Sequence, residues 1–265
     1  MSVRTVDINA DLGESFGNWR MGNDEELIPL ITSANVACGF HASDPMTMLR
    51  TVRSAHESGV AIGAHPGLPD LLGFGRRTMS ISGEELYAAF VYQIGALQGV
   101  LQANGLTLHH VKPHGVLPAM LRDNEELGAA AADALVDLGR PLVYFPAPTD
   151  RGAFLLAARD RGLRVAGEIY PDLSYTSDAR VVVQRQKRAT DLEAASAQVK
   201  LWLETGRVLA EDGSEITLDA ESVCVHGDGP NAPDVARAVR QTIEACGASV
   251  GPVQASDLAH ASTGG

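Results

Sequence analysis

The chain has 265 residues, of which 45% are hydrophobic and 20% charged, and this composition is typical of a globular protein with a large core. Its formal net charge of −12 at pH 7 argues against binding to nucleic acid or to an anionic membrane, because both depend on cationic side chains. No secretory signal or long apolar segment is present, so we expect a cytoplasmic protein that does not span a membrane.

A repeated unit runs along the chain and consists of a short apolar strand, a loop rich in polar residues, and a helix that stops at a glycine. Apolar runs predict seven strands, at residues 6–10, 34–37, 60–64, 108–112, 142–145, 164–169 and 222–225. Residues 248–253 are a candidate for an eighth strand. Residues 207–218 interrupt the series and predict a hairpin that turns at Asp212-Gly213.

Capping residues mark the predicted helices. Asp44 and Pro45 predict an N-cap and first residue, and Ser82 with Glu85 predicts a capping box. Further helix starts are predicted at Asp123, near Asp150, at Thr190 and at Asn231. Strands that alternate with helices indicate parallel βαβ units, and we expect one domain over residues 1–254 followed by a flexible tail, 255–265.

Seven or eight parallel strands can form either an open sheet or a closed barrel. An open sheet places its active site at one switch point, whereas a barrel gathers residues from the ends of most strands. In this chain unusual polar residues follow nearly every strand, namely Asp11, His41, His65, His114, Glu168 and His226. This distribution favours an α/β fold in the form of a (β/α) barrel with its active site at one mouth.

Three histidines at separate strand ends, His65, His114 and His226, are expected to share one pocket. Lys112 lies two residues before His114, so in an extended segment both side chains point to the same face. A lysine there can bind a carboxylate or phosphate, or act as a desolvated base.

Asp11 raises the question of a metal. Together with His65 and His114 it could form a site of two histidines and one carboxylate, suited to zinc, iron or manganese. The long spacing is not diagnostic, so a divalent metal stays open. Cys38, Cys224 and Cys246 contain no Cys-x-x-Cys pair, which argues against a thiolate zinc site and fits a reducing compartment.

Other motifs have simpler interpretations. Ser15 lies in a G-x-S-x-G stretch, but no helix is predicted directly after it, so we do not expect a nucleophile. Arg76-Arg77 could clamp an anion or be structural, and Asp228 could orient His226 or cap the next helix. The chain has no G-x-x-x-x-G-K-[ST] loop and no complete G-x-G-x-x-G fingerprint, so no common nucleotide site can be identified.

Several long segments resemble the lactam-utilisation (LamB/YcsF-type) family. They are "NADLGESFG", "GND", "ITSANVACGFHASDP", "GAHPGLPDLLGFGRR", "YQIGAL", "VKPHG" and "CVHGDGPNA", and the resemblance extends from about Asp7 to Gly247. It implies a distorted seven-stranded (β/α) barrel like that of the polysaccharide-deacetylase superfamily. It also implies the role of the A-type component of a bacterial 5-oxoprolinase, which converts 5-oxo-L-proline, ATP and water to glutamate, ADP and phosphate with two partner subunits. Part of the ATP site could then belong to a partner.

Two loops depart from the family pattern. After "VKPHG" relatives usually continue "ALYN", whereas this chain has "VLPAM" and so lacks the tyrosine and asparagine. After Glu168 relatives usually read "FADRxY", whereas "YPDLSY" keeps Asp172 and Tyr175 and has Leu173 in place of the arginine. We expect both loops to face the pocket, so these changes concern the substrate more than the fold.

Three functions remain. The first is an ATP-dependent component of an enzyme that opens 5-oxoproline or a related lactam; the second is a free-standing metal-dependent amide hydrolase or deacetylase; the third is a non-catalytic lactam-binding protein. For the first we expect catalysis by Asp11, His65, His114 and His226. The residues expected to bind the substrate are Glu14, His41, Arg76, Arg77, Lys112, Glu168 and Asp228.

Overall fold

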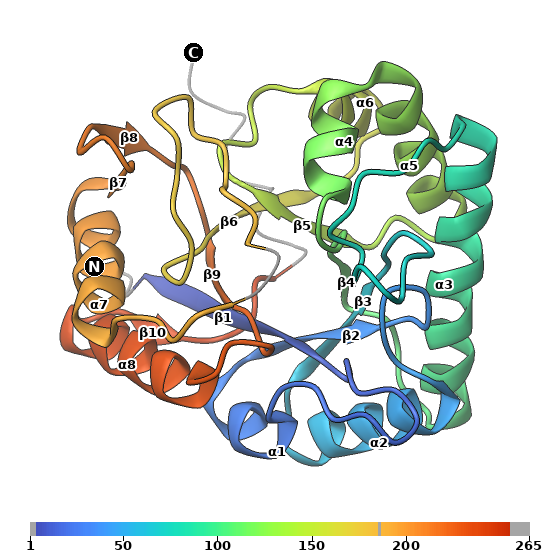
Figure 1. The fold of residues 1–265 in the computed structure, drawn as a ribbon, viewed down its shortest axis with the longest axis horizontal. Helices are drawn as coiled ribbons and strands as arrows, with labels where there is room; N and C mark the ends of the chain where they lie inside the picture. Colours follow the sequence, from blue (N-terminus) through green and yellow to red (C-terminus); the bar gives the residue numbers. More distant parts are fainter. Residues whose placement is uncertain (1–3, 185–186, 255–265) are drawn as a thin grey trace.

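Seven parallel strands close into a barrel in the computed structural model, which describes residues 4–184 and 187–254 (Figure 1). Around the barrel each strand pairs with the next, and β9 closes the ring by pairing with both β6 and β1. The seven are β1 (Thr5–Leu12), β2 (Ser33–Ala37), β3 (Ala61–His65), β4 (His110–Val111), β5 (Leu142–Pro146), β6 (Val165–Ile169) and β9 (Ser222–Val225). The predicted (β/α) barrel is confirmed.

Three short strands lie outside this ring. The eighth candidate strand is present as β10 (Ser249–Val250), which pairs with the start of β1. The predicted hairpin is also present, as β7 (Arg207–Leu209) and β8 (Glu215–Thr217), joined through Asp212-Gly213. The predicted tail, 255–265, lies outside the described residues.

Helices cover the outside of the barrel (Figure 1). They are α1 (Asp24–Leu27), the 3₁₀ helix η1 (Ile28–Leu30), α2 (Pro45–Glu57), α3 (Gly83–Ala103), α4 (Leu117–Asp123), α5 (Glu125–Asp137), α6 (Ala153–Asp160), α7 (Leu192–Thr205) and α8 (Ala232–Ala245). No helix within the described ranges is both long enough and apolar enough to span a membrane.

The caps of α2 and α3 are confirmed. Asp44 accepts hydrogen bonds from two backbone N–H groups of α2, and Ser82 with Glu85 forms the capping box of α3. Two predicted starts are wrong by one residue, since Asn124 caps α5 and Asp191 caps α7. The shift at α5 has a physical reason: Asp123 is the last residue of α4, a short helix that the sequence pattern does not predict.

Strand β1 shows how the barrel acquires a polar interior. Its side chains alternate, with Asp7, Asn9 and Asp11 on one face and the apolar residues between them on the other. Asn9 donates to Glu168 on β6, and Asn35 on β2 donates to both Asn9 and Asp11. Hydrogen bonds therefore satisfy the buried polar groups of the interior, and these bonds hold Asp11 at the mouth.

The pairing between β6 and β9 is short. These strands share two residue pairs, whereas β9 and β1 share four. The described parts of the long connection after β6, residues 170–184 and 187–191, run in front of these strands (yellow in Figure 1). They contribute several residues to the cavity described below.

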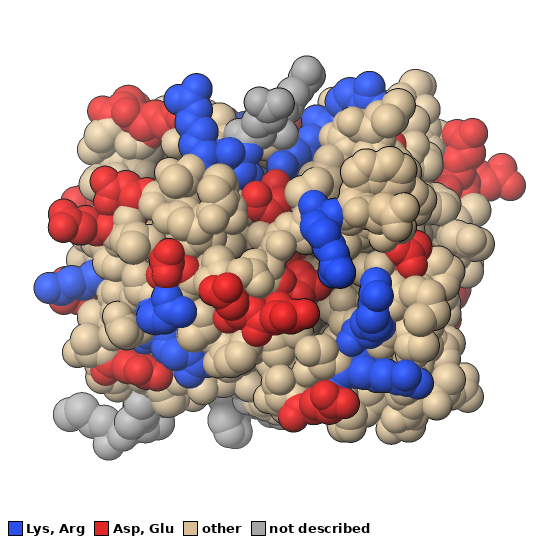
Figure 2. Space-filling model, turned by 60° about the horizontal axis from the view of Figure 1, so that its bottom comes forward, with Lys and Arg blue, Asp and Glu red and all other residues tan. Residues whose placement is uncertain are grey.

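Charge is unevenly distributed over the surface. On the face shown in Figure 2, basic side chains gather near the upper edge, and acidic side chains lie across the middle. Although the chain is acidic overall, with a net charge of −12, parts of its surface are therefore basic.

Candidate active site

A cavity of about 230 Å³ opens at the carboxyl ends of the strands. Among the described residues, five lysines or arginines line it, against a single carboxylate from Asp11. The cationic residues are Arg76, Lys112, Arg122, Arg180 and Lys187. Four of them, Arg76, Lys112, Arg180 and Lys187, form ion pairs with nearby carboxylates, so their number alone does not make the cavity cationic.

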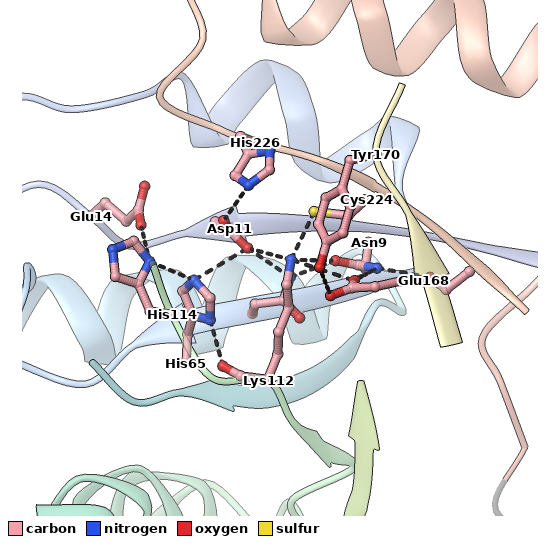
Figure 3. A network of polar contacts seen from close by, with 12 residues as sticks. Asn9, Asp11, Glu14, His65, Lys112, His114, Glu168, Tyr170, Cys224 and His226 are labelled. Carbon is pink, nitrogen blue, oxygen red and sulfur yellow. Dashed lines mark hydrogen bonds and ion pairs between the residues drawn. The ribbon is translucent and has the colours of Figure 1, made fainter. Parts of the chain in front are cut away.

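Asp11 and Lys112 form the inner end of the cavity (Figure 3). Lys112 Nζ lies 3.1 Å from Asp11 Oδ1, and the same oxygen lies 3.4 Å from His65 Nε2. Although burial alone would raise it, the charges of His65 and Lys112 hold the pKa of Asp11 well below its usual range. Asp11 is therefore a carboxylate at neutral pH.

Lys112 is held inside a ring of acceptors. Its Nζ donates to Cys224 Sγ at 2.7 Å and to Asn9 Oδ1 at 3.2 Å, and it lies 3.5 Å from Glu168. Burial alone would lower its pKa, but Asp11, Cys224 and Glu168 raise the pKa well above the usual value. Lys112 is thus a fixed cation, and the alternative of a desolvated neutral base does not fit these surroundings.

The loop after β3 holds His114 in place. Phe74, which has a left-handed φ of 54°, presents its carbonyl oxygen 2.7 Å from His114 Nε2. Next to it Gly75 also has a positive φ, 61°, and a Cβ there would lie only 2.7 Å from the ring of His114. Gly75 therefore lets the loop approach the imidazole closely enough to bind it.

His65 and His114 are in direct contact. His114 Nδ1 lies 2.9 Å from His65 Nε2, and His65 Nδ1 donates to the carbonyl oxygen of Lys112 at 2.7 Å. Both rings line the cavity.

Glu14 and His41 lie behind His114 and do not line the cavity. The rings of His41 and His114 are stacked with centroids 3.6 Å apart, and His41 Nε2 lies 3.3 Å from Glu14 Oε1. Burial and the negative charges of Asp11 and Asp228 raise the pKa of Glu14 well above its usual value, while burial lowers that of His41. Both groups of this buried contact are therefore shifted towards their neutral forms.

His226 lies across the cavity from His114. Its Nδ1 is 2.9 Å from a carboxylate oxygen of Asp172, and its Nε2 is 4.0 Å from Asp11. Lys187 also contacts Asp172, at 3.0 Å. Although burial opposes it, the contacts with His226 and Lys187 lower the pKa of Asp172, so this carboxylate stays charged and orients the imidazole.

Arg76 and Arg77, which are neighbours in the "GRR" segment, have different ion-pair partners. Arg76 reaches the cavity and is bound by Asp228, with Nη1 2.7 Å from the carboxylate. Arg77 turns away and forms an ion pair with Asp70 outside the cavity. The predicted anion clamp of two arginines therefore does not form at the cavity, because only Arg76 reaches it. Asp228 neutralises Arg76 and does not orient His226.

Arg122 differs from the other cations described in the cavity. It donates from Nη2 to the carbonyl oxygen of Pro146 at 3.2 Å, and its buried Nε has no hydrogen-bond partner among the described residues. Within residues 4–184 and 187–254 no ion pair joins it to a carboxylate, whereas Arg180 is paired with Asp123. Arg122 is therefore available for an anionic group of a ligand.

Among the described residues, two groups of side chains could hold a metal ion, namely Glu14, His41, His65 and His114, and Asp11, Cys224 and His226. The set of Asp11, His65 and His114 that the sequence suggested departs from ideal zinc geometry in this structure. The facing nitrogens of His65 and His114 are 2.9 Å apart, whereas two nitrogens on a tetrahedral zinc ion lie about 3.3 Å apart. The ammonium of Lys112 also lies 3.1 Å from Asp11 Oδ1 and already neutralises this carboxylate. In addition, the parallel stacking of His41 and His114 prevents both rings from pointing a lone pair at one ion.

The four residues expected to carry the chemistry all line the cavity, and so do Arg76 and Lys112. Of the other residues expected to bind substrate, Glu14, His41, Glu168 and Asp228 lie behind the lining and support it, and Arg77 lies outside. Asp172, Lys187, Arg122 and Tyr170 were not predicted as site residues. Inward-facing Asn9 could have been found from the alternation of β1, but nothing in the sequence pattern singles out Arg122.

Residues 6–257 match the LamB/YcsF family. The chain belongs to this family. It is 47% identical over 249 residues to a protein from Thermus thermophilus that is named as the A-type component of 5-oxoprolinase, covering 92% of this chain and 98% of the relative. It is also similar to the crystal structure of a lactam utilization protein from another strain of Thermus thermophilus, with 41% identity, a TM-score of 0.84, and coverage of 94% of this chain and all of that one.

A more distant likeness concerns the fold alone. The catalytic domain of a peptidoglycan N-acetylglucosamine deacetylase from Eubacterium rectale is 10% identical, with a TM-score of 0.50, and covers 96% of this LamB/YcsF chain and 93% of that one. The departures from the family pattern, Pro118, Ala119 and Leu173, all line the cavity, as expected.

Proposed function

We propose that this chain is the component of an ATP-dependent 5-oxoprolinase that binds 5-oxo-L-proline, or a related lactam, and opens its ring to L-glutamate. The observation that carries the proposal is the cavity, whose lining combines Arg122 with three imidazole groups and the carboxylate of Asp11. Relatives over nearly the whole chain are named as the corresponding component of 5-oxoprolinase, which supports a shared role.

The cavity chemistry fits a small anionic amide. Arg122 can pair with the carboxylate of the lactam, and such charge-assisted hydrogen bonds are stronger than those between neutral groups. The apolar wall formed by Pro118, Leu173 and Val181 fits the methylene groups of the ring.

Ring opening needs a base for the attacking water. Asp172 accepts a hydrogen bond from His226 Nδ1, so the lone pair of His226 lies on Nε2, the nitrogen near Asp11 at the cavity. We assign His226 as this base, with Asp172 as the group that sets its tautomer and orientation.

ATP has a defined chemical task in this reaction. A γ-lactam is a poor electrophile, and phosphorylation of its amide oxygen makes the carbon more reactive towards water. Because the chain has no recognisable phosphate-binding loop, we propose that two partner subunits complete the enzyme and supply most of the nucleotide site.

The second candidate is a free-standing metal-dependent hydrolase, in which Glu14, His41, His65 and His114, or Asp11, Cys224 and His226, could hold the ion. The test is reconstitution with both partner subunits and measurement of ADP and glutamate formed from 5-oxoproline. The proposal expects both products in equal amounts, and their loss with His226→Asn. No 5-oxoproline-dependent ADP release by the complete complex would remove the proposed function.

A further inference from the structure

Large apolar side chains are exposed on three neighbouring loops at the mouth of the barrel. The loops follow β1, β2 and β3, and the exposed side chains on them and on the helices after them are Trp19, Met21, Met46, Leu71, Leu72 and Tyr92. We call these six residues the rim surface. Elsewhere on the described surface, exposed large apolar residues are spread singly over α6, the loop after β6, α7 and β7, as is usual for a folded protein. Exposed apolar residues that gather in one area, in contrast, mark interaction sites.

Contacts between the three loops make the rim surface continuous. The loop after β1 passes in front of α2 (Figure 1), and the backbone N–H of Gly17 in this loop donates to Asp44 at 3.0 Å. Asp44 ends the loop after β2. In the same loop His41 packs against the loop after β3, where a Cβ on Gly67 would lie only 2.4 Å from His41 Nδ1. The exposed apolar side chains of the three loops therefore share one face of the molecule.

Two aromatic residues of the rim surface are held in ordered positions. The backbone N–H of Trp19 donates to the carbonyl oxygen of Phe16 at 2.9 Å, Phe16 donates back at 3.0 Å, and the two rings are stacked. Trp19 is nevertheless 72% exposed. Tyr92 is stacked on Phe40, with ring centroids 5.4 Å apart. Ordered aromatic side chains lose little conformational entropy on binding, and tryptophan and tyrosine often dominate the binding energy of protein interfaces.

The position of the rim surface indicates which partner it binds. The loop that carries Leu71 and Leu72 also carries Arg76, which lines the cavity, so a partner seated on this surface borders the cavity. In the proposed function ATP has to reach a lactam in that cavity, although the chain has no recognisable phosphate-binding loop. A second copy of this chain would bring no such loop either. The occupant that this position suits is therefore the subunit that carries the nucleotide.

The charges beside Trp19 define the chemistry of that partner. Residues 18–26, "NWRMGNDEE", contain one arginine and three acidic residues. Glu25 and Glu26 begin α1 close to Trp19 in the chain, and neither is paired with a cation among the described residues. The rim surface therefore suits an apolar patch bordered by lysines or arginines, and cationic side chains are also what a subunit that handles a polyphosphate requires.

We propose that the rim surface is the docking site of the nucleotide-carrying subunit, and that docking there brings ATP to the mouth of the cavity. The inference rests on the proposed function, from which it takes the need for ATP. It adds the place of contact, centred on Trp19 and Leu72, and the kind of surface that the partner presents.

Binding can be followed at Trp19 itself. The chain has two tryptophans, and the other, Trp202, is fully buried. In protein labelled with fluorotryptophan, the ¹⁹F resonance that Trp19→Phe removes should shift when the unlabelled ATP-binding partner subunit is added, whereas the resonance of Trp202 should stay. A Trp19 resonance that does not move in the complex would overturn the proposal. Failure of that subunit to bind the wild-type chain, or a shift that follows the concentration of this chain alone, would do the same.

Two substitutions test whether the rim surface contributes to affinity. Trp19→Glu and Leu72→Glu should each raise the Kd for the ATP-binding subunit at least about tenfold, because each removes an apolar contact and adds negative charge to an acidic margin. Leu156→Glu on α6 and Leu209→Glu on β7 are matched controls, 45% and 46% exposed in the wild type, and should bind as the wild type does. Circular dichroism of the isolated chains checks that all four variants fold. Equal weakening in the controls would contradict the assigned surface.

Kinetics of the reconstituted complex separate docking from chemistry. At limiting partner, Trp19→Glu and Leu72→Glu should lose most of the ADP release that depends on 5-oxoproline, and excess partner should restore it. A loss that excess partner does not restore would contradict a docking role. A wild-type complex that forms through Trp19 but does not act on 5-oxoproline would contradict the proposed function while confirming the contact.

Discussion

The carboxylate of Asp172 contacts Nδ1 of His226, while the other ring nitrogen, Nε2, faces Asp11. Its oxygen lies 2.9 Å from His226 Nδ1, and Lys187 holds the same carboxylate from the other side at 3.0 Å. A carboxylate in this position fixes one tautomer of the imidazole and stabilises the imidazolium that forms when the ring accepts a proton. The loop after β6 therefore controls a residue that follows β9.

Asp172→Asn tests this control. An amide can present its N–H₂ group to His226 Nδ1 and so favour the wrong tautomer, and we expect kcat to fall about 100-fold or more with KM little changed. The matched control is Asp178→Asn, an exposed carboxylate of the same loop that binds Arg180. Steady-state kinetics of the reconstituted complex make the comparison, and equal losses in both variants would contradict the assignment.

Lys112→Met should damage the fold as well as the site. The ammonium is buried and neutralises Asp11 and Glu168, so the methionine leaves two buried carboxylates without this cation. Removing one partner of a buried ion pair typically costs about 3–5 kcal/mol. Urea denaturation should show a loss of this size in the free energy of unfolding, and a loss below about 1 kcal/mol would mean that Lys112 contributes little to these carboxylates.

Arg122→Gln should weaken substrate binding without destabilising the chain. Loss of a hydrogen bond to a charged group corresponds to an increase of about 10- to 100-fold in KM for 5-oxoproline. Arg180→Gln is the control, because Arg180 lines the same cavity but is already paired with Asp123 and Asp178. An unchanged KM in Arg122→Gln would show that the substrate carboxylate lies elsewhere.

Gly75→Ala tests whether the loop after β3 positions His114. Its Cβ would lie 2.7 Å from the His114 ring in a residue with a φ of 61°, so the carbonyl of Phe74 has to move. Gly59→Ala is the control for backbone strain alone, since Gly59 has a similar φ of 71° and open space around it. Both should lose about 1 kcal/mol of stability from the left-handed backbone, but only Gly75→Ala should also lower kcat.

Much of the fold could be predicted because local signals and tertiary structure agree. The apolar runs fall on all seven barrel strands, and the caps at Asp44 and Ser82 are used as expected. Helix α4 was missed because no side chain caps its start at Val116, and its presence moves the next cap from Asp123 to Asn124. A one-residue error of this kind does not change which strands are neighbours.

For the site, the sequence predicts only which residues lie at strand ends. Position on the chain places Asp11, His65, His114 and His226 at one mouth, but it does not show which side chains already have partners. Arg76 and Asp228 both look available in the sequence, yet they neutralise each other. Arg122 is singled out by the absence of an acidic partner among the described residues, which is a property of the assembled structure.

The protonation of Glu14 can be tested through the pH dependence of stability. Burial and nearby negative charges raise its pKa in the folded chain well above the usual 4.5. Above pH 4.5 the unfolded chain releases this proton while the folded chain keeps it, so the folded state binds more protons and its stability falls as pH rises. The amide introduced by Glu14→Gln cannot ionise in either state and resembles the neutral acid in shape.

Glu14→Gln should therefore gain stability relative to the wild type as pH rises from about 4.5, by up to about 1.4 kcal/mol per pH unit, until the raised pKa is passed. The difference in unfolding free energy between the two proteins, measured by urea denaturation at several pH values, isolates this group from the other titrating residues. Glu84→Gln, an exposed glutamate at the start of α3, should show no such trend. A difference that stays flat or falls with pH would mean that Glu14 is ionised in the folded chain.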